Sequence, residues 1–253
     1  MISDLLLLSG NDIPFREARL NIHQPTLKEI GYIGEDAFFT GCELLNFSKD
    51  ILNSEDRIHL ENKSNFEIFM SIMKDQKNSA IQKNRINSML LLTLMFPSYN
   101  FTFLKDQIAF KLKDSNQEED ICFIDKNNFE EFKKILVTMF CLKRGKGETQ
   151  DYNPQGEMAR KIAEKLRKGR EKVAAAKGST KKISILSRYI SILTVGEGKN
   201  INDILNLTVY QLFDEFERFE LKQSYDAYIQ ARLAGAKDIE QVDNWMKELH
   251  SES

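Results

Sequence analysis

The stretch from Lys143 to Lys182 constrains the fold of this chain most, because it offers few large apolar side chains to a core. Its first part, ending at Pro154, is polar and glycine-bearing without periodicity, which is typical of a linker. Its second part, Glu157–Ala176, is rich in Ala, Lys, Arg and Glu, which predicts a helix without a large apolar face. We therefore expect an N-terminal domain at 1–142, a polar linker and basic helix at 143–182, and a C-terminal domain at 183–253.

Charge is unevenly distributed along the chain. Residues 157–182 hold ten Lys or Arg against three Glu, a local +7, whereas the whole chain carries −2 and the remainder therefore about −9. The basic helix fits a solvated linker, a contact with a protein partner, or a contact with nucleic acid. The side chains expected to meet a polyanion are Lys165, Arg167, Lys168 and Arg170. No aromatic residue is interleaved among them for base stacking, so nucleic acid is the least favoured of the three.

The N-terminal domain is predicted to be α+β and predominantly helical, with two short β-hairpins. The first hairpin is expected from Leu5–Leu8 and Ala18–Ile22, and the second from Ile108–Leu112 and Ile121–Ile124, where apolar and polar residues alternate between turn residues. Helices are expected where apolar residues recur at helical spacing. The first of these helices begins at Thr26, with Glu29 placed to complete its cap. The others are expected at Asp36–Leu52, Asn65–Lys74, Ala80–Phe96 and along the apolar stripe Phe129–Phe140.

The C-terminal domain is predicted to be small and all-helical, with a long aromatic-rich helix at its centre. The expected helices are Ile183–Leu193, Ile201–Leu205, Val209–Ala234 and one near Val242–Leu249. About seventy residues make only a small core, so part of the aromatic surface is expected to be left for a partner. The candidate partner-binding residues are Tyr210, Phe213, Tyr228 and Trp245, and the sequence does not decide which of them face outward.

The sequence contains no pattern that predicts a catalytic, cofactor or metal site. Its histidines, His23, His59 and His250, have no metal-ligand spacing, and no cysteine pair has the two-residue spacing of a zinc site. His23 is therefore interpreted as a loop-orienting or surface histidine. Gly31 and Gly34 are not followed by Gly-Lys-Ser/Thr, so we interpret them as local backbone adjustments rather than as a phosphate-binding loop.

The cysteines and the apolar runs indicate in which cellular compartment the protein is expected to lie. Cys42, Cys122 and Cys141 are odd in number, widely spaced and mostly set among apolar neighbours, which favours three reduced thiols in the core and a reducing environment. The apolar runs Leu5–Leu8 and Met89–Phe96 are too short to cross a bilayer. Apolar residues at 42% and charged residues at 29% exclude wholesale disorder. We therefore expect a globular cytoplasmic protein with no membrane partner.

Both ends of the chain resemble phage proteins. Ile22–Ile30, followed by Ile33–Glu35, resembles the N-terminal region of proteins encoded among phage morphogenesis genes. Leu207–Phe216, followed by Ala231–Ala236 and Trp245-Met246, is similar to the helical segments of tail-assembly chaperone-like proteins from phages of low-GC Gram-positive bacteria. The resemblance covers roughly the first fifty and the last seventy residues, and its motifs carry no chemistry.

The resemblance implies a non-enzymatic chaperone or scaffold that works in the cytoplasm of the infected host. Such a protein coats the tape-measure protein and keeps its apolar helices soluble while the tail tube polymerises. Self-association is compatible with this function, no cofactor is implied, and members often occur in a short and a frameshifted longer form. Two alternatives stay open: a head–tail or baseplate-associated component of the virion, and a phage regulator that binds nucleic acid through the basic helix.

Overall fold

The computed structural model describes residues 2–47, 62–75, 79–113, 121–142, 184–236 and 240–247, and within them the fold is α+β and predominantly helical, as predicted. The helices are α1 Asp4–Ser9, the 3-10 helix η1 Arg16–Ala18, α2 Leu27–Ile33, α3 Glu35–Leu45, α5 Asn65–Lys74, α6 Ser79–Met95, α7 Phe129–Met139, α9 Ile185–Glu197, α10 Ile201–Leu205 and α11 Val209–Leu233. The strands are β1 Ile13–Phe15, β2 Leu20–Ile22, β3 Tyr99–Phe103, β4 Gln107–Leu112 and β5 Ile121–Asp125.

The first predicted hairpin is half wrong. Leu5–Leu8 belongs to helix α1, and β2 pairs instead with β1, in an antiparallel register that places Ile13 opposite Ile22. Helix α1 forms because Ser3 caps it by accepting a hydrogen bond from the Leu6 N–H, and because Gly10 ends it in the left-handed conformation at φ 69°. Four consecutive leucines carry no periodicity, so the cap residues decided the outcome.

The second predicted hairpin is confirmed, and it belongs to a larger sheet. β4 pairs antiparallel with β5, and a third strand, β3, which the sequence did not predict, pairs with the other edge of β4 in the order β3-β4-β5. Ile108 and Phe110 of β4 are fully buried, whereas Ala109 between them and Lys111 after them are more exposed. One face of the central strand therefore packs on the core.

Most of the predicted helices are present in the structure, and two of them begin with a capping box. Thr26 and Glu29 form the predicted capping box at the start of α2, and Ser64 and Glu67 form a second one at the start of α5. Helix α3 ends at Leu45, earlier than predicted, and residues 48–61 lie outside the described residues. The predicted helix near Val242–Leu249 is wrong in its described part, because residues 240–247 contain turns and no helix.

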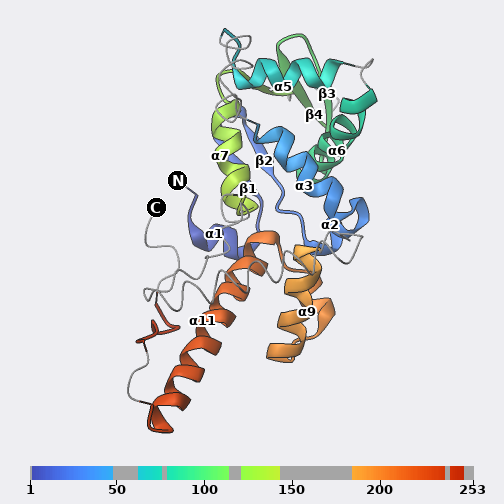
Figure 1. Ribbon diagram of the computed structural model, residues 1–253. Helices are drawn as coiled ribbons and strands as arrows, with labels where there is room; N and C mark the ends of the chain where they lie inside the picture. Colours follow the sequence, from blue (N-terminus) through green and yellow to red (C-terminus); the bar gives the residue numbers. More distant parts are fainter. Residues whose placement is uncertain are drawn as a thin grey trace.

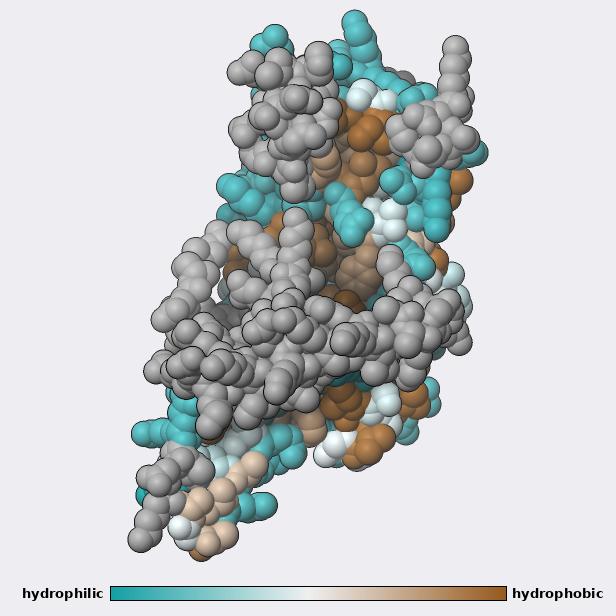
Figure 2. All heavy atoms as spheres, in the orientation of Figure 1, coloured by the Kyte–Doolittle hydropathy of each residue, from teal (hydrophilic) through white to brown (hydrophobic). Residues whose placement is uncertain are grey.

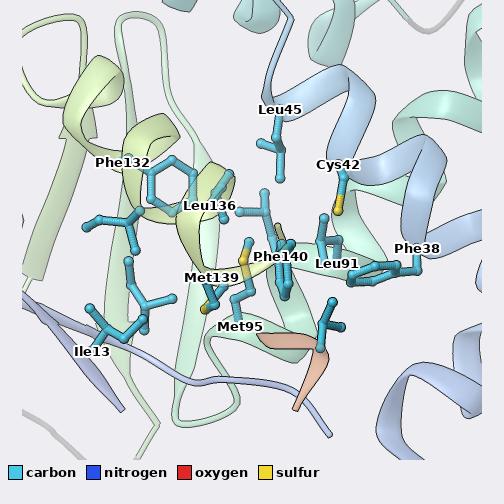
Figure 3. Close-up of a cluster of buried hydrophobic side chains, with 14 of the residues drawn as sticks. Ile13, Phe38, Cys42, Leu45, Leu91, Met95, Phe132, Leu136, Met139 and Phe140 are labelled. Carbon is cyan, nitrogen blue, oxygen red and sulfur yellow. The ribbon is translucent and has the colours of Figure 1, made fainter. Parts of the chain in front are cut away.

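Buried side chains from the N-terminal part of the chain and from α9, α10 and α11 join in one hydrophobic core. Figure 3 shows Phe38, Cys42 and Leu45 of α3 converging with Leu91 and Met95 of α6 and with side chains of α7. The same core contains Leu186 and Leu193 of α9 and Val209, Tyr210, Leu212 and Phe216 of α11. Burial raises the pKa of the Cys42 thiol. Cys42 and Cys141 are free thiols in the core, as predicted, whereas Cys122 is free but only partly buried against it.

The C-terminal helices lie at one end of the molecule, beneath the body formed by the sheet and helices α3, α6 and α7 (Figure 1). Helix α11 begins against this body and then runs away from it, beyond the end of α9 (Figure 1). The division of the chain at 142 and 183 stays a prediction. The structure adds that the two predicted domains share buried side chains in the core.

Candidate interaction surface on helix α11

The start of α11 is fixed to the N-terminal part of the chain through backbone contacts. The Leu27 N–H donates to the Leu207 carbonyl at 2.8 Å, and Thr26 forms an isolated β-bridge with Thr208. Thr208 also forms a capping box with Gln211, so it holds the helix start and the bridge at once. The first turn of α11 therefore has a fixed position beside the first turn of α2.

Helix α1 holds the first turn of α11 from a second side. Gln211 donates through Nε2 to the Leu8 carbonyl at 2.7 Å, and the Tyr210 hydroxyl bonds the Asp4 carboxylate at 3.1 Å. A Cβ at Gly10 would lie 3.3 Å from Gln211 Nε2, closer than a side chain is comfortably accommodated. The glycine that ends α1 thus also permits this close approach.

Helix α9 covers one side of the first half of α11. The Tyr189 ring stacks on Phe216 at a centroid distance of 3.8 Å and 6° between planes, and meets Phe213 edge-on at 5.3 Å. Phe219 reaches the end of α9, where a Cβ on Gly196 would lie 2.4 Å from its ring. The aromatic residues on this side of α11 are therefore occupied by α9.

An ion-pair cluster follows at the end of α9. Lys199 Nζ lies 2.8 Å from Glu215 and 3.0 Å from Glu197. Burial alone would lower the pKa of Lys199, but the hydrogen bonds and charges of the two glutamates outweigh it and raise the pKa. Beyond this cluster and Phe219, α11 continues without α9 beside it (Figure 1).

The second half of α11 carries a separate apolar stripe. Leu221, Tyr225, Tyr228 and Ile229 recur at spacings of three and four, which places them on one side of the helix; we call them the α11 stripe. Phe216 and Tyr225 are nine residues apart, about two and a half turns, so the stripe faces roughly opposite to the side that α9 covers. Ile229 is 37% exposed, and Leu233 beyond the stripe is 83% exposed.

The four predicted partner-binding residues are not brought together. Tyr210 is buried at 3% exposure, and Phe213 is half-buried against Tyr189, both in the first half of α11. Tyr228 belongs to the α11 stripe and is half-buried. Trp245, also half-buried, lies in the segment 240–247, whose backbone Arg218 of α11 contacts.

Leu221, Tyr225 and Ile229 are not among the predicted partner-binding residues, although Leu221 and Ile229 are apolar and Tyr225 is one of the aromatic residues of this helix. A calculation of their angular positions at 3.6 residues per turn would have found the change of side after Phe219. Figure 2 shows hydrophobic and pale residues among hydrophilic ones at the projecting end of α11.

The polyanion candidates Lys165, Arg167, Lys168 and Arg170 lie outside the described residues.

Among the residues that the structure describes, no group of three or more His, Cys, Asp or Glu side chains is arranged to hold a metal ion. His23 bonds Asp12 through Nδ1 at 3.0 Å and Glu29 through Nε2 at 3.3 Å, and so links the segment before β1 to the start of α2. This arrangement agrees with the predicted loop-orienting role. Within the same described ranges, every helix is too short or too polar to cross a membrane.

Part of the chain is similar to a known protein family. The family of the YomV second domain matches residues 178–250, a region that contains α9, α10 and α11. YomV is a Bacillus phage gene product, and the match fits a phage protein. The match covers less than a third of the chain. No curated protein and no solved structure shows detectable similarity to it.

Proposed function

We propose that this chain is a non-enzymatic phage tail-assembly chaperone that binds the tape-measure protein through the second half of α11. The observation that carries the proposal is the α11 stripe, an apolar face on a helix that leaves the body of the protein after Phe219. Residues 220–233 extend about 20 Å at 1.5 Å per residue, enough for a partner helix to pack along several turns.

The position of the stripe suits a chaperone. The first half of α11 is anchored to α1, α2 and α9, so a partner bound to the second half would not disturb the core. Long apolar helices of a tape-measure protein expose the kind of side chains that pack on such a stripe. The match to a phage domain family over the same region supports a phage partner.

Co-expression with the tape-measure protein of the same phage tests the proposal. The full chain should raise the soluble yield of that protein, and Tyr228→Ala should weaken the complex by about 1–3 kcal/mol. The melting temperature of the free variant should barely change, because Tyr228 lies outside the core. Gln230→Ala, an exposed residue on the opposite side of the same turn, is the matched control and should bind like the wild type.

The proposal fails if the tape-measure protein stays insoluble beside the full chain, or if Gln230→Ala weakens the complex as much as Tyr228→Ala. Mass spectrometry of purified virions separates the chaperone from a structural component. A chaperone leaves the assembled tail, so its peptides should be absent. Their presence at stoichiometric amounts would instead assign the chain to the virion.

A further inference from the structure

The segment 240–247 returns along α11 after the helix has ended. Helix α11 closes with the Gly235 N–H bonded to the Arg232 carbonyl, and Gly235 adopts φ 94°, which reverses the chain direction. Figure 1 shows residues near 245 beside the middle of α11 rather than beyond its end. The segment therefore runs back toward the body of the protein.

The side chain of Arg218 holds this segment on the helix. Nη1 of Arg218 donates to the carbonyls of Trp245 and Lys247, both at 2.7 Å. Within the part of the chain that the structure describes, both hydrogen bonds that join 240–247 to the other elements start from this nitrogen. The segment also keeps its own turn, because the Lys247 N–H bonds the Asn244 carbonyl and Lys247 Nζ pairs with Asp243.

Arg218 lies on the same side of α11 as the stripe. Leu221 follows it by three residues and Tyr225 by seven, which is the spacing of one helical face. The segment that Arg218 holds therefore lies beside α11 near the residue at which the stripe begins (Figure 1). Val242 and Trp245 within it are half-buried, whereas Met246 is 67% exposed.

We propose that residues 240–247 form a strap that closes over the start of the α11 stripe and opens when the assembly partner binds. This inference rests on the proposed function for the identity of the partner, but not for the closure itself. Both hydrogen bonds start from one guanidinium, so release breaks these two bonds and exposes the half-buried Val242 and Trp245. No residue of the core cluster has to move, because none of the cluster's side chains comes from 240–247. If the strap is closed in most molecules, only the open fraction can bind the partner. The apparent dissociation constant is then the intrinsic one divided by that open fraction.

Trp245 is the only tryptophan of the chain, so its fluorescence reports the strap directly and needs no partner. Arg218→Ala in the full chain should shift the Trp245 emission to longer wavelengths and raise its quenching by acrylamide about twofold, since the half-buried ring becomes solvated. Arg232→Ala, an exposed arginine in the last turn of the same helix, is the control and should leave both quantities unchanged. Arg218→Lys, which keeps the charge without the guanidinium geometry, should give an intermediate result.

Circular dichroism checks that the variants keep the helical content of the wild type. Wild-type emission and quenching in a helical Arg218→Ala protein, or equal changes in Arg232→Ala, would overturn the strap. If Arg218→Ala does not fold, the Trp245 emission and quenching of Arg218→Lys are compared with those of the wild type. Identical quenching in these two proteins would count against the closed strap.

A second measurement tests the competition. A chain that ends at Ala236 lacks the strap and should bind the tape-measure protein about tenfold more tightly than the full chain, as expected for a stripe that is about nine-tenths covered. Equal affinity of the two chains would show that the strap does not compete. If neither chain binds while Trp245 still responds to Arg218→Ala, the proposed function fails and the closure stands.

Discussion

Glu35 is the residue that joins α9 to the N-terminal part of the molecule. One carboxylate oxygen accepts hydrogen bonds from the N–H groups of Ile185 at 2.8 Å and Leu186 at 3.2 Å, and the other accepts one from the Ser184 hydroxyl. A carboxylate at a helix N-terminus satisfies donors that have no partner within the helix and interacts favourably with the helix dipole. A residue of α3 thus caps a helix that begins about 150 residues later.

Replacing this carboxylate should loosen α9. Glu35→Ala leaves the Ile185 and Leu186 donors without their acceptor and should lower the free energy of unfolding by about 1–3 kcal/mol. Urea unfolding of the two proteins measures the difference. Glu43→Ala, an exposed glutamate on the same helix, should change stability by less than about 0.5 kcal/mol. Equal effects of the two substitutions would contradict the role assigned to Glu35.

Glu29 makes one part of the stability depend on pH. Burial tends to raise the pKa of this carboxyl, but hydrogen bonds from the Thr26 N–H and hydroxyl, together with His23, outweigh burial and lower the pKa. The pKa of Glu29 is therefore lower in the folded protein than in the unfolded chain. The ionised carboxyl stabilises the folded state fully above the ordinary glutamate pKa of about 4.3, and this stabilisation disappears as the pH falls through the folded pKa.

Glu29→Gln should therefore lower the free energy of unfolding at pH 7, by roughly 0.5–2 kcal/mol for a damaged cap, and the deficit should shrink as the solution is acidified below about pH 4.3. Unfolding curves at several pH values measure this difference. Lys28→Gln is the control, since a lysine does not titrate in this range. A deficit of constant size from pH 7 to about pH 3 would contradict the assignment to Glu29 ionisation.

At the scale of elements, the contact between α3 and α6 is set by a glycine. A Cβ on Gly41 would lie 2.9 Å from the Asn87 backbone carbonyl and 3.1 Å from Leu91 Cβ, so the two helices meet with no room for a side chain there. Gly31 in α2 has open space around it, and its backbone is not in the left-handed region. The left-handed glycine of the Gly31–Gly34 pair is Gly34, at φ 87°, where α2 ends and α3 begins.

Alanine should lower the stability of the protein at Gly41 and raise it at Gly31. Gly41→Ala should destabilise the protein by about 1–3 kcal/mol, because backbone and packed side chains must move apart. Gly31→Ala should stabilise it by roughly 0.5–1 kcal/mol, because alanine has the higher helix propensity and meets no neighbour. Thermal unfolding measures both variants, and a stabilised Gly41→Ala protein would show that the helix contact is looser than described.

At the scale of the whole molecule, the C-terminal helices belong to the same core as the N-terminal part. Val209, Tyr210, Leu212 and Phe216 are buried in it, and the Leu27–Leu207 backbone hydrogen bond fixes their position. A cut in the chain between these parts does not remove any of those contacts. The two fragments of a nicked protein should therefore stay together.

Limited trypsin digestion tests this expectation. The sequence predicts that trypsin cuts first between Lys143 and Lys182, where Lys and Arg are dense and apolar residues are few. The fragments should co-elute in native size-exclusion chromatography, unfold in one transition, and separate only in denaturant. Elution at two positions without denaturant would instead support independent domains on either side of the linker, and a first cut inside Asp36–Phe96 would contradict the predicted division of the chain.

The sequence by itself determined the elements whose signals are local. The capping box of Thr26 and Glu29, the alternation in β4 and β5 and the apolar periodicity of α7 each act within a few residues, so they predicted the structure correctly. Local signals also explain the error at Leu5–Leu8, since Ser3 and Gly10 mark the two ends of α1 and outweigh the leucine run between them.

Only the tertiary structure decided which side chains of α11 are covered by other elements. Tyr210 and Tyr228 lie on the same helix and look equivalent in the sequence, yet α1 covers the first while the second projects beyond α9. The cap that Glu35 supplies to α9 and the hold of Arg218 on the strap likewise join distant residues. Burial is fixed by which elements meet in space, and no pattern confined to one element specifies its neighbour.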